Sequence, residues 1–125
     1  MTGATMLPEI HRHRYQDFQQ ILERLRRLIS QPNCEKALLK AEISLAQQFF
    51  QDQVRCLDLD ELDAAVGQRS RSFHVEINKQ LRLLATDVMF LQAAKQAATS
   101  QQRLEQVGDR VNTLIRYCDA LLQKE

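Results

Sequence analysis

Two histidines stand two residues apart near the start of the chain, at His11 and His13. Imidazole is a common ligand of zinc and other transition metals, so the pair is a candidate metal site. On a helix, however, side chains share a face at spacings of three or four residues, and residues two apart point in different directions. We therefore expect two solvated histidines here and no metal site.

A run of carboxylates occupies the middle of the chain, at Asp58, Asp60, Glu61 and Asp63. Clustered carboxylates can bind calcium, but this run lacks the central glycine and the distal glutamate of a calcium-binding loop. Acidic side chains also favour the first turn of a helix, and Asp58 with Glu61 three residues later has the form of a helix start. We therefore interpret the run as the capped beginning of a helix.

The cysteines are candidate nucleophiles, at Cys34, Cys56 and Cys118. Only Cys34 is expected near a helix N-terminus, which can activate a thiol by lowering its pKa. Because Cys34 and Cys118 both occupy apolar positions of predicted helices, we interpret them as buried structural thiols. An odd number of cysteines without close spacing favours reduced thiols and a cytoplasmic protein.

Asp87 is surrounded in sequence by apolar residues. It either pairs with an arginine or lysine from another helix or, in the interpretation that we favour, faces solvent. The chain contains no P-loop, no glycine-rich dinucleotide turn, no H-E-x-x-H and no G-x-S-x-G motif. We therefore predict a protein that is not an enzyme and has no cofactor.

Basic side chains gather in three places, and they include Arg24, Arg26, Arg27, Arg69, Arg71, Lys79 and Arg82. Arginine is favoured at interfaces because its planar guanidinium pairs well with carboxylates. An acidic peptide or an acidic protein surface would be a suitable partner. The alternative for each cation is a solvated helix face, since exposed charges usually contribute little.

Two apolar runs cannot lie entirely on one core stripe: Met89, Phe90 and Leu91, and the pair Phe49 and Phe50. Either other helices surround these side chains inside the protein, or one side of each run forms a second interface. A homodimer is one such arrangement, because unsatisfied apolar faces often pair isologously.

The composition indicates which kind of secondary structure carries these side chains. The chain has 125 residues, enough for one domain over 1–125, and a hydrophobic content of 44%, with only three Gly and two Pro. Sheet-rich folds need frequent turns built from such residues, so helices are predicted. The net charge of +1 argues against general attraction to nucleic acid, and no apolar run is long enough to cross a membrane.

Apolar residues at spacings of three and four predict four helices, over about 8–29, 34–54, 59–98 and 99–123. The last carries the most regular seam, and Thr99 with Gln102 matches a capping box at its start. In the third, Gly67 predicts a kink, a short break or an exposed arm, because glycine is unfavourable inside a helix. With residues 1–7 as a flexible N-terminus, the short connections predict an all-α, antiparallel up-down bundle.

Three segments of the chain resemble the cyanobacterial PatD family of heterocyst frequency control proteins. They are residues 13–18 (HRYQDF), 76–96 (EINKQLRLLATDVMFLQAAKQ) and 110–122 (RVNTLIRYCDALL). The resemblance is weakest over residues 58–72. It implies a cytoplasmic regulator of heterocyst differentiation that binds the tubulin-like division protein FtsZ and modulates its assembly.

The predicted function is therefore that of a non-catalytic, protein-binding regulator of cell division. From the residues alone, the predicted partner-binding surface comprises Arg24, Arg27, Lys79, Arg82 and Phe90. One alternative is a nucleic-acid-associated transcriptional regulator, whose affinity would fall steeply with salt. Another is an enzyme or ligand sensor with a polar cavity around Asp87.

Overall fold

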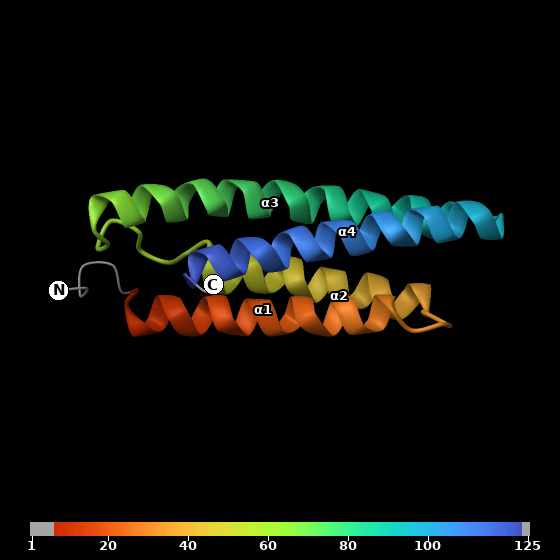
Figure 1. The fold of residues 1–125 in the computed structure, drawn as a ribbon, viewed down its shortest axis with the longest axis horizontal. Coiled ribbons are helices and arrows are strands. Elements are labelled where there is room, and N and C mark those ends of the chain that lie inside the picture. The colour runs from red at the N-terminus through yellow and green to blue at the C-terminus, as the bar shows by residue number, and fades with distance from the viewer. Residues whose placement is uncertain (1–6, 124–125) are drawn as a thin grey trace.

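The computed structural model describes residues 7–123, which form four long helices and no strand (Figure 1). The helices are α1 (Glu9–Ile29), α2 (Lys36–Phe49), α3 (Ala64–Ala93) and α4 (Ala97–Leu121), and a π-helical turn, η2 (Phe50–Val54), extends α2. The predicted all-α bundle is confirmed. The predicted flexible terminus lies outside the described residues except for Leu7, which is half-buried and packs against the core.

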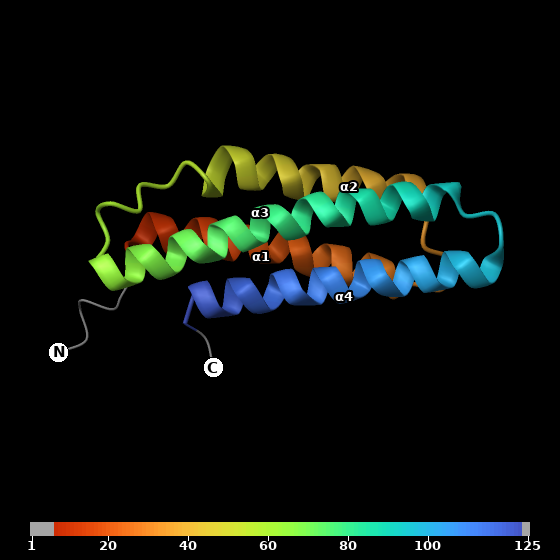
Figure 2. The same ribbon diagram turned by 90° about the horizontal axis from the view of Figure 1, so that it is seen from above.

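Successive helices run antiparallel, so the topology is up-down-up-down (Figures 1 and 2). Helix α1 packs against α2 and α4, and α3 packs against the same two helices. Helices α1 and α3 therefore lie diagonally across the bundle. This arrangement separates the cations of α1 from those of α3.

The core consists of the apolar stripes of all four helices. The seam predicted for the last helix is inside the bundle, with Val107, Val111, Leu114, Cys118 and Leu121 all buried. These residues recur every three or four positions, which keeps them on one side of a helix with 3.6 residues per turn. The regular seam of α4 thus brings it against both α1 and α3.

Phe49 and Phe50 both turn toward the inside, at the junction of α2 and η2. Their ring centroids lie 6.2 Å and 5.8 Å from that of Phe18 in α1. Neighbouring residues on a helix differ in direction by about 100°, so both can contact a ring that lies between them. No second interface is needed to cover this pair.

One predicted helix start and one predicted cap are wrong. Helix α3 begins at Ala64, several residues after Asp58, and the Asp58 carboxylate instead accepts a hydrogen bond from the Asp60 backbone N–H at 3.0 Å. Helix α4 begins at Ala97 without a side-chain cap, so Thr99 does not form a capping box. In both places the local sequence could support a cap, but neither helix start has a side-chain cap.

The predicted kink at Gly67 is also wrong, because α3 continues through this residue. Gly67 is buried, and a Cβ atom there would lie 2.9 Å from the backbone oxygen of Leu59. Residues 55–63, which connect η2 to α3 and which we name the crossing segment, therefore approach the helix too closely for any larger residue. Gly67 has no side chain and so permits this close contact, and it does not break the helix.

Replacing Gly67 with alanine is expected to lower the free energy of unfolding by about 1–3 kcal/mol, because the crossing segment must shift. The matched control is Gly108→Ala in α4, where a Cβ would meet Ile29 at 3.7 Å, an ordinary contact. That variant should gain up to about 1 kcal/mol of helix stability. Urea unfolding measures both, and equal stabilisation by the two substitutions would contradict the proposed close contact.

Candidate functional site

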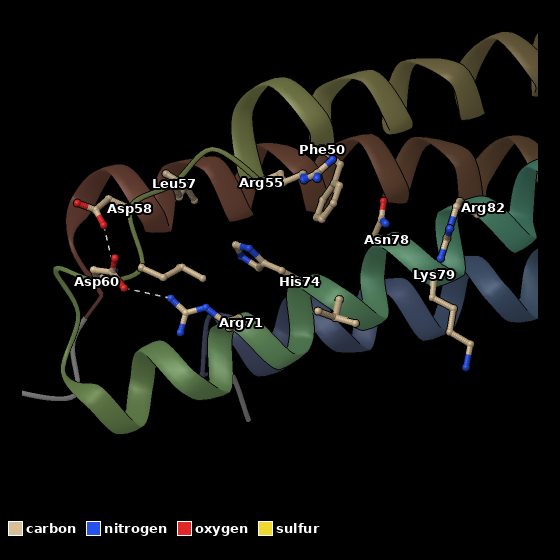
Figure 3. A pocket seen from close by; sticks show the side chains of 12 residues that line it. Phe50, Arg55, Leu57, Asp58, Asp60, Arg71, His74, Asn78, Lys79 and Arg82 are labelled. Atoms are coloured by element: carbon tan, nitrogen blue, oxygen red, sulfur yellow. Dashed lines mark hydrogen bonds and ion pairs between the residues drawn. The ribbon is translucent and has the colours of Figure 1, made fainter.

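A groove of about 540 Å³ opens where the crossing segment passes α3 (Figure 3). Four cations line this groove, which we name the basic groove: Arg55, Arg71, Lys79 and Arg82. Asp58 and Asp60 are its carboxylates, so the lining carries an excess of positive charge. Such an arrangement favours a partner with negative charge.

Most of the cations come from one face of α3. Arg71, Val75 and Lys79 follow one another at intervals of four residues, and Asn78 precedes Arg82 by the same interval. Residues four apart are neighbours on a helix surface, so these side chains form adjoining rows. The fourth cation, Arg55, comes from the crossing segment and faces α3 from the other side of the groove (Figure 3).

The cations differ in how they are paired. Arg71 forms an ion pair with Asp60 at 3.2 Å, and Arg55 donates a hydrogen bond to the Gln51 side chain at 2.7 Å. Lys79 and Arg82 are exposed, and neither forms an ion pair with another residue of the range 7–123. These two charges are therefore available to a partner.

His74 forms the inner end of the groove and is itself buried. Its Nε2 atom lies 2.8 Å from the hydroxyl of Tyr15, and its ring packs edge-on against Phe50. Burial, together with repulsion from His11 and Arg71, lowers the pKa of His74 to about 4. His74 is thus neutral at physiological pH and accepts the hydrogen bond that Tyr15 donates.

Tyr15 supports His74 from α1. Burial raises the pKa of Tyr15 to about 12, although a hydrogen bond from Ser70 partly opposes this shift. The phenol therefore keeps its proton and remains a donor. The pair ties α1 to α3 across the bundle and makes the inner end of the groove uncharged.

His11 is not solvated, contrary to the prediction: it is 1% exposed, whereas His13 lies at the surface as expected. The Nε2 atom of His11 donates to the backbone oxygen of Asp58 at 3.0 Å. Its Nδ1 atom lies 3.5 Å from a carboxylate oxygen of Glu61. His11 therefore holds the crossing segment against α1, a role that its spacing from His13 could not reveal.

The five predicted partner-binding residues fall in three separate places. Lys79 and Arg82 line the basic groove, whereas Arg24 and Arg27 lie on α1, diagonally across the bundle, and Arg24 is within 3.4 Å of Glu42. Phe90 is 51% exposed, beyond the groove on α3, with the Arg103 guanidinium 4.8 Å above its ring. The structure thus brings together only the two cations of α3.

Asp87 does not face solvent. It is buried, and it forms an ion pair with Arg110 of α4. Arg110 also donates to the Gln80 side chain at 3.3 Å. The less favoured interpretation, pairing with a cation from another helix, is therefore the correct one. The pair lies in the contact between α3 and α4, and a pocket of about 310 Å³ beside it is lined by Arg110, Gln80 and Asp109, among others, but not by Asp87.

Arg69 and Phe73 serve the bundle itself. The Arg69 guanidinium donates to the backbone oxygen of Ala120 at 2.6 Å and lies 5.4 Å from the centroid of the Phe73 ring. The contact joins the beginning of α3 to the end of α4. Arg69 is thus engaged within the protein, unlike Arg71, which reaches the groove.

The surroundings of Cys34, the candidate nucleophile, do not activate its thiol. Cys34 is half-buried, and burial raises the pKa of its thiol, which disfavours the reactive thiolate. Cys118 is buried in the core, as predicted, and Cys56 is exposed. Within residues 7–123, no group of three or more His, Cys, Asp or Glu side chains is placed to hold a metal ion.

Sequence reasoning missed Arg55, His74 and Tyr15 as parts of the site. The two four-residue intervals from Arg71 through Val75 to Lys79 were a usable signal for the helical side of the groove. No periodic pattern could place Arg55, because it lies outside the regular helices.

No protein family, curated protein or solved structure matched the chain in comparisons of sequence and fold. Within the part of the chain that the structure describes, no helix combines the length and apolar character needed to cross a bilayer.

Proposed function

We propose that this protein is a non-catalytic regulator that binds an acidic segment of a partner protein in the basic groove. The observation that carries the proposal is the presence of two exposed cations without ion pairs, Lys79 and Arg82, beside an exposed apolar residue. That residue, Val75, is 64% exposed. Charge attracts and orients an acidic partner, and apolar contact adds affinity after docking.

FtsZ is the first partner to test, and cell division with heterocyst differentiation in the cytoplasm is the proposed context. This choice rests on the resemblance of residues 13–18, 76–96 and 110–122 to the PatD family. Binding along a filament would alter its assembly by changing the contacts between filaments. If the protein is a homodimer, two grooves would link two filaments through multivalency, and sedimentation equilibrium tests that state.

Charge reversal in the groove, Lys79→Glu with Arg82→Glu, is expected to weaken FtsZ binding at least about tenfold, equivalent to about 1.4 kcal/mol. The expectation follows because the two cations are exposed and face the partner directly. Isothermal titration against purified FtsZ measures the affinity, and light scattering reports filament assembly. Circular dichroism checks that each variant remains folded.

The matched control is Arg24→Glu with Arg27→Glu, which changes the net charge equally on the diagonal helix α1. Binding by this control should stay within about twofold of the parent protein, a difference well below 1.4 kcal/mol. Loss of binding in the α1 variant but not in the groove variant would reject the groove as the site. Binding of a short DNA duplex with a steep dependence on salt would instead favour the nucleic-acid alternative.

A further inference from the structure

The crossing segment alternates two kinds of side chain over residues 57–63 (LDLDELD). Its leucines are half-buried, and its carboxylates at Asp58, Asp60, Glu61 and Asp63 are exposed. A segment of this kind presents negative charge beside a groove that carries positive charge. The protein therefore holds acidic groups of its own next to the site that we propose for an acidic partner.

Two of the contacts that hold this segment use its backbone, and the Glu61 side chain also lies against His11. His11 donates to the backbone oxygen of Asp58, and Gly67 leaves room for the backbone oxygen of Leu59. The Asp60 carboxylate, in contrast, reaches a cation of the groove, Arg71 (Figure 3). The segment can thus keep its position when this one ion pair is exchanged for another.

The Asp60–Arg71 ion pair is open to exchange. The two side chains are 90% and 56% exposed, respectively. Ion pairs at such positions contribute only about 0–1 kcal/mol, since water competes for both partners. A carboxylate of an incoming segment can therefore replace Asp60 at little cost.

The rows on α3 also indicate the form of that incoming segment. Arg71 and Lys79 are eight residues apart, which corresponds to about 12 Å along a helix with a rise of 1.5 Å per residue. Four residues of an extended chain span about 13 Å, and side chains at alternate positions share one face. An extended segment can therefore place two carboxylates at Arg71 and Lys79 and the residue midway between them at Val75.

Resting on the proposed function, we infer that the basic groove binds an extended segment with two carboxylates four residues apart and an aliphatic residue midway between them, and that Asp60 competes with this segment for Arg71. The groove is then partly occupied by the chain itself. Such competition lowers the affinity for weakly acidic sequences. Because Asp60 pairs with Arg71 alone, Lys79 and Arg82 remain available for the first encounter with the incoming segment.

The test uses the full chain and a fluorescein-labelled, amidated peptide of sequence Ser-Glu-Thr-Leu-Thr-Glu-Ser, with binding followed by fluorescence anisotropy. Asp60→Asn is expected to raise the affinity two- to fivefold, the range expected for an exposed ion pair. Asp63→Asn is the control, because it removes the same charge from the same segment at a residue that forms no ion pair within 7–123. Replacing the peptide's leucine with serine, or its glutamates with glutamine, should weaken binding.

A double-mutant cycle with Arg71→Gln distinguishes direct competition from a general change of charge. In the Arg71→Gln background, the gain from Asp60→Asn should disappear. Equal gains from Asp60→Asn and Asp63→Asn would overturn the inference, as would a peptide that binds none of the proteins. If FtsZ binding is nevertheless lost on reversing Lys79 and Arg82, the proposed function stands without this inference; if it is unaffected, both fail.

Discussion

Acidification from pH 6.5 toward 4 is expected to destabilise this protein by about 3 kcal/mol through His74 alone. The folded protein lowers the pKa of this residue to about 4, whereas the unfolded chain has the ordinary value of 6.5. Between these values the unfolded chain binds a proton that the folded protein excludes. The stabilisation is therefore complete above pH 6.5 and is lost as the pH falls through the folded value.

The cause lies in the surroundings of the imidazole. Burial disfavours the charged form first, and His11 and Arg71 add positive charge nearby. The Tyr15 hydroxyl, 2.8 Å away, donates to a neutral ring and cannot do so to a protonated nitrogen. All of these contacts favour the neutral form of His74.

Urea unfolding at a series of pH values measures this effect, with His74→Gln as the comparison because glutamine retains an acceptor for Tyr15. The variant should lose less stability than the parent protein between pH 6.5 and 4. The difference between the two curves removes the contribution of carboxylates and of the other histidines. Parallel curves would mean that folding does not lower the pKa of His74.

Removal of the cation in the buried ion pair, by Arg110→Met, is expected to cost about 3 kcal/mol of unfolding free energy. Asp87 is buried and would be left without its partner, apart from what water can reach through the partly exposed position of Arg110. The penalty comes from the unpaired charge more than from the lost attraction. Thermal and urea unfolding both measure it.

Two further variants test whether charge or packing causes this loss of stability. Arg116→Met removes an exposed arginine from the same helix and should change stability by less than about 0.5 kcal/mol. The double variant Asp87→Leu with Arg110→Met removes both charges and should recover most of the loss, since an apolar pair can replace a buried ion pair. A double variant as unstable as Arg110→Met would mean that packing, not charge, determines the cost.

The cations of α3 show what spacing along the sequence can and cannot predict. An interval of three residues correctly indicated that Lys79 lies near Arg82, and intervals of four connect Lys79 to Arg71 through Val75. Helical spacing could not show which helix lies diagonally opposite α3. The predicted surface therefore joined α1 to α3, although the two helices are diagonal.

The residues that contact the crossing segment were the hardest to interpret. His11 looked solvated beside His13, and the glycine at position 67 looked like a break, because both were judged on helix properties alone. Each is explained by the crossing segment, which contacts His11 through Asp58 and Gly67 through Leu59. The segment follows no period, so its path could not be predicted from the sequence.

The amino-acid sequence by itself determined four amphipathic helices and their antiparallel order, since helical periodicity and short connections are local properties. Only the tertiary structure decided the basic groove, the neutral His74 and the burial of Asp87. These features depend on groups far apart in the chain, such as His11 with Asp58 at a separation of 47 residues and Tyr15 with His74 at 59. Packing brings such groups together and removes water from them. The loss of water determines which of these side chains are charged in the folded protein.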